Sequence, residues 1–221
     1  MKNLKKLVED YPMKGKLLLT SLLMMSATAA QAWELQYYAG FGMGQGFFTK
    51  DADGVERELA RRDWPNPEAS MKDNTTVWKA YFGAYFTPFL GMQLGYANLG
   101  NADVKASANV NPGEEQAFVK DMAESQPDLG KGVQLSVTGR FPISENITVH
   151  DWLGVFFWKN ESSAILGGKK VTETTKGTNF VLGAAAEYRL NYELGLRVEF
   201  ERFNQSGDAV NVYGASVAYY F

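Results

Sequence analysis

Short segments in which apolar and polar residues alternate recur along most of the chain. In residues 75–87, Trp78 and Phe82 occupy alternate positions, and Lys79 and Tyr81 fall between them. Successive side chains of a β-strand point to opposite faces, so this period of two predicts strands with one apolar face. Beyond residue 32, no stretch approaches the ~20 consecutive apolar residues that a membrane-spanning helix needs. The pattern therefore predicts an all-β fold.

Eight such segments follow residue 32. They span residues 33–44, 75–87, 90–100, 132–141, 147–158, 179–190, 192–203 and about 209–221. Charged residues such as Lys79, Arg140 and Glu187 fall on the faces opposite to the apolar ones. An Arg or Lys on the lipid-facing side costs roughly 2–4 kcal/mol near the bilayer midplane, which favours apolar faces toward lipid and charges inside. Because every backbone group in hydrocarbon must be paired, such a sheet must close into a barrel.

The connections between these segments fall into two classes. Three are short, at residues 87–89, 142–146 and 190–192, and three are long and polar, near residues 47–74, 101–131 and 159–177. The seventh connection, FNQSGDA at residues 203–209, joins the last two segments. The two classes alternate along the chain, so each class falls at one end of the sheet. Short periplasmic turns and long extracellular loops are typical of outer-membrane barrels. We therefore expect a closed, eight-stranded antiparallel transmembrane β-barrel. The alternative is a soluble barrel whose apolar face surrounds a ligand.

The first 32 residues have the pattern of a secretory signal peptide. Lysines at positions 2, 5, 6, 14 and 16 precede an apolar run from Leu17 to about Ala30. The run closes on Ala30-Gln31-Ala32, which has the small-x-small form of a cleavage site. A membrane anchor is the alternative, but the run is shorter than the ~20 residues of a spanning helix. We expect a signal peptide at 1–32, export through the Sec pathway, and a barrel at 33–221.

Composition excludes several other classes of protein. The chain of 221 residues has no Cys, which excludes disulfide scaffolds, zinc ribbons and thiol nucleophiles. Its formal net charge of −3 gives no sign of the basic stripe that nucleic-acid binding requires. The acidic run at residues 51–56 hints at calcium but lacks the further ligands of an EF-hand loop, so a solvated turn is the simpler interpretation. We expect no cofactor, no metal site and no nucleic-acid partner.

His150 is the only histidine in the sequence. A lipid-modifying barrel enzyme would need this residue as a base, on the lipid face or at the rim beside a Ser or an acidic residue. The alternation of its strand places it inside the barrel instead, near the periplasmic end and two residues before Trp152. We therefore expect a packed interior histidine and no catalytic residue.

Three longer segments resemble a known family. They read AYFTPFLGMQLGYANLG, LSVTGRFPISENITVHDWLGVFFWK and GAAAEYRLNYELGLRVEFERFNQSGD. Together they resemble the eight-stranded transmembrane domain of outer membrane protein A and its small porin-like and opacity-type relatives in Gram-negative bacteria. The resemblance implies an outer-membrane barrel. It implies less about function, because this fold carries structural proteins, adhesins and some enzymes. Since the sequence ends with the eighth strand, we expect no peptidoglycan-binding domain.

The resemblance also implies a network of charged and polar side chains inside the barrel. Three of the family's charges match in type, and three are replaced by Gln93, Thr138 and Trp152. The expected network consists of Lys79, Gln93, Thr138, Arg140, Glu187, Arg189, Glu193, Arg197 and Glu199. A buried ion that loses its partner is costly, so we expect the pairs Glu187–Arg197 and Arg189–Glu193. Eight strands leave an interior just wide enough for side chains, which argues against a conducting pore.

The last nine residues, YGASVAYYF, keep the alternation to the end of the sequence. We expect them to form the eighth strand, paired with the first. The lipid-facing residues of this strand are then Tyr213, Ala215, Val217, Tyr219 and Phe221. The resemblance implies that they form the signal read by the barrel-assembly machinery. Loss of Phe221 is expected to impair assembly more than its few contacts in the folded barrel would explain.

Two of the long loops contain helical patterns. In residues 111–128, Asn111 is placed as a cap and Pro112 in the first turn, and Phe118 and Met122 form an apolar stripe at i, i+4. A second helix is expected within residues 54–64. We expect the first helix to pack on the barrel rim or to meet a partner.

These features favour a monomeric, non-enzymatic outer-membrane barrel whose loops serve cell-surface interaction or adhesion and envelope integrity. The expected partners are outer-membrane lipid and lipopolysaccharide, the barrel-assembly machinery, and host or phage surface molecules bound by the loops. Two alternatives stay open, namely a lipid-modifying barrel enzyme and a small passive channel.

Overall fold

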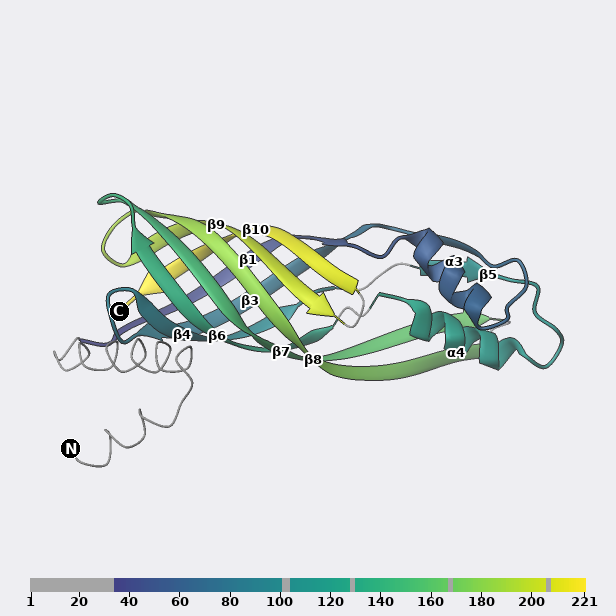
Figure 1. Cartoon of the computed structure of the whole chain (residues 1–221). Coiled ribbons are helices and arrows are strands. Elements are labelled where there is room, and N and C mark those ends of the chain that lie inside the picture. Colours follow the sequence, from purple (N-terminus) through teal and green to yellow (C-terminus); the bar gives the residue numbers. More distant parts are fainter. Residues whose placement is uncertain (1–33, 101–103, 128–129, 167–168, 206–207) are drawn as a thin grey trace, which may run out of the picture.

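The computed structural model describes residues 34–100, 104–127, 130–166, 169–205 and 208–221. The predicted signal peptide, residues 1–32, lies outside the described residues. Eight of the described strands form one closed antiparallel barrel, and a smaller group of helices and strands lies at one of its ends (Figure 1). No helix in the described part of the chain is long and apolar enough to cross a membrane.

The barrel strands follow one another around the ring in chain order. They are β1 (Gln36–Phe48), β3 (Asn74–Tyr85), β4 (Leu90–Asn98), β6 (Lys131–Pro142), β7 (Ile147–Leu166), β8 (Lys169–Arg189), β9 (Leu194–Gln205) and β10 (Asp208–Tyr220). Each of them overlaps one of the eight predicted segments. Strand β10 pairs with β1, with Val217 opposite Phe41, so the last segment closes the barrel as predicted.

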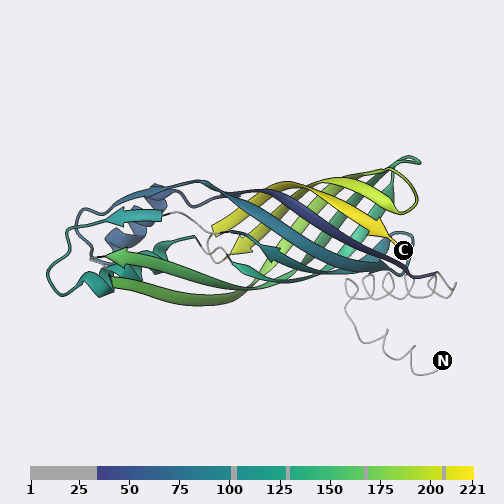
Figure 2. The same ribbon diagram turned by 180° about the vertical axis from the view of Figure 1, so that it is seen from behind.

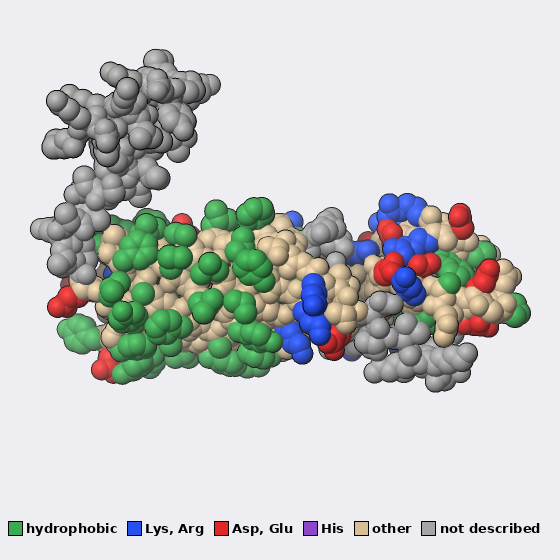
Figure 3. All heavy atoms as spheres, turned by 90° about the horizontal axis from the view of Figure 1, so that it is seen from below, with side chains coloured by type: hydrophobic (Ala, Val, Ile, Leu, Met, Phe, Trp, Pro, Cys, Tyr) green, Lys and Arg blue, Asp and Glu red, His purple; other side chains and the backbone are tan. Residues whose placement is uncertain are grey.

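The outer surface of the barrel is covered by large apolar side chains, which we call the apolar belt (Figure 3). Phe180 is 68% exposed, Leu153 is 62% exposed and Met43 is 56% exposed. Soluble proteins rarely leave so large a continuous apolar surface open to water, whereas lipid accommodates it. The apolar side chains therefore point outward, as predicted. The soluble alternative, which needs the apolar face inside, is wrong.

Short turns join the strands at the end of the barrel where the C-terminus lies (Figure 1). In the turn after β3, the Thr87 hydroxyl accepts a hydrogen bond from the Leu90 N–H at 2.8 Å. In the turn after β8, the Asn191 side chain accepts one from the Leu194 N–H at 2.8 Å. These local side-chain bonds replace strand pairing at the point where the chain reverses. We call this end of the barrel the turn end.

At the opposite end lies a compact group that we call the head. It consists of α3 (Ala52–Arg61), β2 (Glu68–Met71), β5 (Val104–Ser107), α4 (Glu115–Ser125) and the outer parts of β7 and β8. Figures 1 and 2 show α4 beside the extended hairpin of β7 and β8, and α3 at the same end of the molecule. Strands β2 and β5 pair with each other, and α4 packs on α3, β7 and β8.

The prediction of a long loop at residues 159–177 is wrong. Strands β7 and β8 continue through this segment and stay paired, from Lys159 opposite Lys176 to Leu166 opposite Lys169. The segment contains three threonines, one valine and one isoleucine, whose branched side chains favour strands, so its polarity does not prevent strand pairing.

The two helices of the head occur close to the predicted positions, with corrected starts. Helix α4 begins at Glu115 and not beside Asn111, because Gly113 has a φ of +99° and the chain makes a turn there first. Helix α3 begins at Ala52, and its cap is Asp51, whose side chain accepts a hydrogen bond from the Gly54 N–H at 2.8 Å. The acidic run that hinted at calcium is therefore a helix cap and first turn.

Candidate functional site

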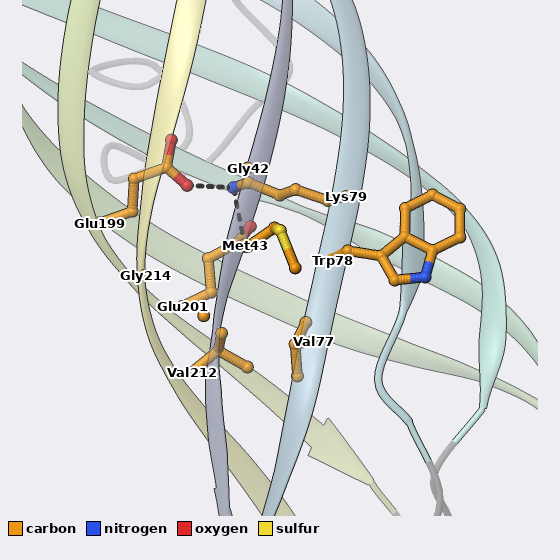
Figure 4. Close-up of a pocket in the computed structure, with 10 residues that line it drawn as sticks. Gly42, Met43, Val77, Trp78, Lys79, Glu199, Glu201, Val212 and Gly214 are labelled. Atoms are coloured by element: carbon orange, nitrogen blue, oxygen red, sulfur yellow. Dashed lines mark hydrogen bonds and ion pairs between the residues drawn. The ribbon is translucent and has the colours of Figure 1, made fainter.

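The barrel interior holds a first group of charges around Lys79. The Lys79 ammonium lies 2.6 Å from Glu199 and 2.8 Å from Glu201, and all three side chains are buried (Figure 4). Glu201 also accepts a hydrogen bond from the Trp152 indole N–H at 2.8 Å. Beside Lys79 lies a cavity of about 10 Å³, the scale of a single water molecule. One cation thus holds two carboxylates in a nearly filled space.

A second group lies nearer the turn end, around Glu187. Its carboxylate is 1% exposed and accepts hydrogen bonds from Arg197 at 2.7 Å, Arg189 at 2.5 Å and the Tyr220 hydroxyl at 2.5 Å. Arg197 also donates to the Tyr220 hydroxyl at 2.7 Å. A buried carboxylate is tolerable only when its lone pairs are satisfied, and here strands β8, β9 and β10 each supply donors.

Tyrosine rings fill the space around these charges by lying over glycines. Tyr38 is fully buried, stacks on Tyr85 at a centroid distance of 5.0 Å, and stands opposite Gly83 on β3. A Cβ built on Gly83 would come within 2.3 Å of the Tyr38 ring. Tyr81 lies over Gly40 in the same way, across the same pair of strands. The glycines therefore make room for the rings that close the lumen.

Most of the predicted network residues do face the interior. Gln93 accepts a hydrogen bond from the Tyr38 hydroxyl at 3.2 Å, and Thr138 is buried close by. Arg140 is half-buried at the turn end, where it lies over the Tyr85 ring and donates to the Pro88 carbonyl at 3.0 Å. The predicted pair Glu187–Arg197 is confirmed.

The predicted pair of Arg189 with Glu193 is wrong. Arg189 turns to Glu187 instead, and Glu193 is exposed in the turn before β9, where it accepts a hydrogen bond from the Tyr219 hydroxyl at 3.2 Å. Alternation could not place Glu193, because the chain becomes a strand only at Leu194. Glu193 is therefore not part of the interior network.

Two central members of the interior were missing from the predicted set. Glu201 is the second partner of Lys79, and Tyr220 bonds both Glu187 and Arg197. Both signals were present in the sequence. Glu201 has the same strand parity as Glu199, and Tyr220 lies between the outward residues Tyr219 and Phe221.

Between these charges and the head lies a set of apolar side chains that we call the apolar layer. It consists of Val77, Ala97, Leu99, Phe156, Trp158, Val181, Phe203, Val210 and Val212. Phe156 and Phe203 meet edge to face at a centroid distance of 5.1 Å, and both are fully buried. Hydrophobic constrictions oppose ion passage because water leaves them. The lumen thus contains polar groups on the turn side and a dry layer on the head side.

His150 lies in the lumen as predicted, at 1% exposure. Its Nδ1 is 2.9 Å from the Tyr85 hydroxyl, and its Nε2 is 3.4 Å from Glu187. A base in this position reaches neither lipid nor the rim. In the described part of the chain, no three His, Asp or Glu side chains gather as a metal site.

The residues predicted as the assembly signal all lie on the outer face of β10 and at its end, as the alternation indicated. The expectation that Phe221 makes few contacts is wrong. Its backbone exchanges two hydrogen bonds with Tyr37, and its ring lies near those of Tyr37, Phe82 and Tyr219. The chain end is thus held to β1 by both backbone and side chain.

The head has its own core and its own ion pairs. Val55 and Leu59 of α3 and Phe118, Val119 and Met122 of α4 are buried together. The predicted stripe of α4 is therefore covered within the head.

A partly exposed cluster of charged side chains joins the two helices. Arg62, directly after α3, lies 2.8 Å from Asp121 and 2.6 Å from Glu124 of α4. Asp121 also accepts a hydrogen bond from the Trp64 indole N–H at 2.9 Å. The hydrogen bond to Glu124 is the largest cause that raises the pKa of Arg62 above its ordinary value, so the charge is retained. The helices are thus fixed to each other through side chains 57 or more residues apart in the chain.

The family of the chain follows from sequence comparison. The sequence model of the OmpA-like transmembrane domain matches residues 32–218. The chain belongs to this family. Outer membrane protein A of Shigella flexneri is 28% identical over 130 residues, which cover 58% of this chain and 33% of that protein. Outer membrane protein A of Klebsiella aerogenes is 26% identical over 188 residues, which cover 84% of this chain and 47% of that protein. The chain spans less than half the length of both relatives.

Solved structures share the fold of this OmpA-like domain. Ail, the attachment invasion locus protein of Yersinia pestis, has a TM-score of 0.51 at 13% identity and covers 86% of this chain and 100% of its own. OprG from Pseudomonas aeruginosa has a TM-score of 0.50 at 14% identity, with 85% and 95% covered. Together with the family match and the apolar belt, these comparisons identify a β-barrel of the bacterial outer membrane.

Proposed function

We propose that this OmpA-like barrel is a monomeric, non-enzymatic surface protein whose head binds molecules outside the cell and which also contributes to envelope integrity. The observation that carries the proposal is the head itself. It has a buried core and a cross-helix ion pair, and it is joined to the barrel by the continuous hairpin of β7 and β8. A folded unit on a rigid scaffold presents a fixed surface to a partner, at a lower entropic cost than loose loops.

The proposed orientation places the turn end in the periplasm and the head outside the cell. Outer-membrane barrels place short turns in the periplasm and larger connections at the surface. In this orientation the end of the C-terminal strand lies in the periplasm, where the barrel-assembly machinery meets its substrates. This placement supports the proposed role of Phe221. A signal peptide at 1–32 would deliver the chain to that side.

Neither alternative function is supported by the interior. The enzyme hypothesis required His150 on the lipid face or at the rim, whereas it is buried in the lumen against Tyr85. The channel hypothesis requires a wet path, whereas Phe156 and Phe203 are part of an apolar layer across the lumen. The filled lumen instead supports a scaffold.

The test is a variant, called head-deleted, in which residues 50–72 and 101–129 are each replaced by a short turn. It loses α3, β2, β5 and α4 and keeps only the outer parts of β7 and β8 from the head. Bacteria that display the protein are expected to adhere to cultured epithelial cells and to heparin-coated surfaces, and the variant is expected to lose this adherence. Heparin is included as a probe because Ail, which shares the fold, was solved with the heparin analogue sucrose octasulfate.

Heat-modifiable migration in detergent gels, which reports a closed barrel, serves as the control for folding. The variant is expected to keep this behaviour and its surface level. Undiminished adherence by the head-deleted variant would contradict the proposal.

A further inference from the structure

Three lysines form a row across three neighbouring strands. Lys131 on β6 stands directly opposite Lys159 on β7, and Lys159 stands directly opposite Lys176 on β8. All three side chains are exposed. Adjacent strands lie about 4.8 Å apart, so the row spans roughly 10 Å of the outer surface. We call Lys131, Lys159 and Lys176 the lysine row.

The lysine row lies at the head-side border of the apolar belt. Lys131 shares its strand face with Val133, and Lys159 shares its face with Phe157, so the same outward alternation leads from apolar side chains to lysine. On β8, the exposed Phe180 lies on the same face four residues from Lys176. Figure 3 shows Lys and Arg side chains between the apolar belt and the head. A cationic row thus directly adjoins an apolar surface.

The charges of the row are only partly compensated. Like charges at directly opposed strand positions repel each other and destabilise the pairing. In the described part of the chain, the carboxylate that pairs with the row is Glu161, 2.6 Å from the Lys159 ammonium. Its hydrogen bond to Lys159 is the main cause that holds the pKa of Glu161 below its ordinary value, and Lys131 contributes through its charge. Three cations against one carboxylate leave a surface that attracts a further anion.

We propose that the lysine row binds the phosphate groups of a phosphorylated glycolipid of the lipid A type in the outer leaflet, with the acyl chains against Val133, Phe157 and Phe180. A membrane-embedded ligand is favoured over a soluble phosphate because the apolar surface continues directly from the row. This inference rests on the proposed orientation, because only in that orientation does the lysine row face the outer leaflet. Phosphate oxygens between neighbouring ammonium groups would remove the repulsion along the row.

The test uses the full-length protein extracted from outer membranes in mild detergent, with fluorescent lipid A as the probe. The row variant is K131Q/K159Q/K176Q, and the matched control is R57Q/K105Q/K120Q, which removes three exposed charges from the head. The probes are bisphosphorylated lipid A, the same lipid after enzymatic dephosphorylation, phosphatidylglycerol and inorganic phosphate. Heat-modifiable migration checks that each variant is folded.

Bisphosphorylated lipid A is expected to bind the wild-type protein and the control alike, and to bind the row variant roughly tenfold or more weakly. Dephosphorylated lipid A is expected to lose affinity for the wild-type protein and to show little further loss with the row variant. Equal loss in the control, or unchanged binding by the row variant, would overturn the proposal.

Two further outcomes would also overturn it. If phosphatidylglycerol bound as tightly, the row would recognise anionic lipid in general. If millimolar inorganic phosphate displaced lipid A completely, the site would take free phosphate. The head-deleted variant separates this inference from the proposed function, because it keeps the row and is expected to bind lipid A without supporting adherence.

Discussion

Lys79 is the residue on which the electrostatic balance of the lumen depends. It is the cation between Glu199 and Glu201, and both carboxylates are buried with it. Charges removed from water need partners, and the loss of one partner leaves the others exposed to the full desolvation cost. In the second group, by contrast, Glu187 has two arginines, so the loss of either one leaves the other.

The substitution Lys79→Met is therefore expected to destabilise the folded barrel by about 3–5 kcal/mol, because it leaves two buried carboxylates without a cation. The measurement is urea-induced unfolding in lipid vesicles, followed by heat-modifiable migration. The matched control is the triple variant K79M/E199Q/E201Q, which removes the charges together and is expected to recover most of the lost stability. If Lys79→Met were as stable as the wild-type protein, the two carboxylates would be hydrated or protonated in the folded barrel without a loss of stability, which would contradict this prediction.

Gly83 offers a test of packing in place of charge. The substitution Gly83→Ala is expected to cost about 1–3 kcal/mol, because its Cβ would meet the Tyr38 ring, which is fully buried and stacked on Tyr85. The control is Gly95→Ala, another inward glycine, where the nearest atom would be 3.6 Å away. The same unfolding assay compares them. Equal stabilities for the two variants would contradict the role given to Gly83.

At this scale, alternation predicted which side chains point inward but not which of them bond. The resemblance placed Glu187 and Arg197 in the network, and their shared inward parity and the cost of an unpaired buried ion predicted their pair. It could not distinguish Arg189 bonding to Glu187 from Arg189 bonding to Glu193, because the choice depends on where β9 begins. Strand parity also applies to Glu201 and Tyr220, so these two residues were predictable in principle.

Among the elements, the closing strand β10 combines a structural role with a proposed role in assembly. Deletion of Phe221 removes two backbone hydrogen bonds to Tyr37 and a ring from a cluster that includes Phe82. Stability and assembly must therefore be separated by a control that disturbs the same cluster and leaves the chain end intact.

Deletion of Phe221 is expected to lower the amount of protein in the outer membrane several-fold, and Phe82→Ala is expected to lower it far less. Quantitative immunoblots of outer-membrane fractions give the amounts, and refolding of both purified variants in detergent reports their stability. If the two variants reached the outer membrane in equal amounts, the effect of deleting Phe221 would come from lost ring packing alone. That result would contradict its proposed role in the assembly signal.

The boundaries of the elements show where sequence patterns were insufficient. All eight barrel strands were predicted because their alternation extends over most of their length. Residues 159–177 are mostly polar in sequence, which predicts a loop, but polarity indicates contact with solvent rather than the absence of strand pairing. The start of α4 was displaced by a glycine with positive φ, a backbone state that the pattern of apolar residues does not report.

At the scale of the whole molecule, the lumen has a polar half and a dry half in series. A continuous water path would have to cross the apolar layer that contains Phe156 and Phe203. The purified protein is therefore expected to give no stable conductance steps in planar bilayers. The variant F156A/F203A, which opens this layer, is the positive control and is expected to give small steps or current bursts. Regular ohmic steps from the wild-type protein would show that the layer does not seal the barrel.

The length of the paired hairpin of β7 and β8 sets how far the head extends from the membrane. From Lys159 at the border of the apolar belt to Leu166, the strand rises about 23 Å, since each residue advances roughly 3.3 Å. In the proposed orientation, the head therefore extends from the layer of lipid phosphates into the zone of surface sugars. Bacteria with short sugar chains would then leave the head uncovered, whereas a dense coat of long chains would screen it. The same protein would thus have its binding surface open or shielded according to the glycan length of the cell that makes it.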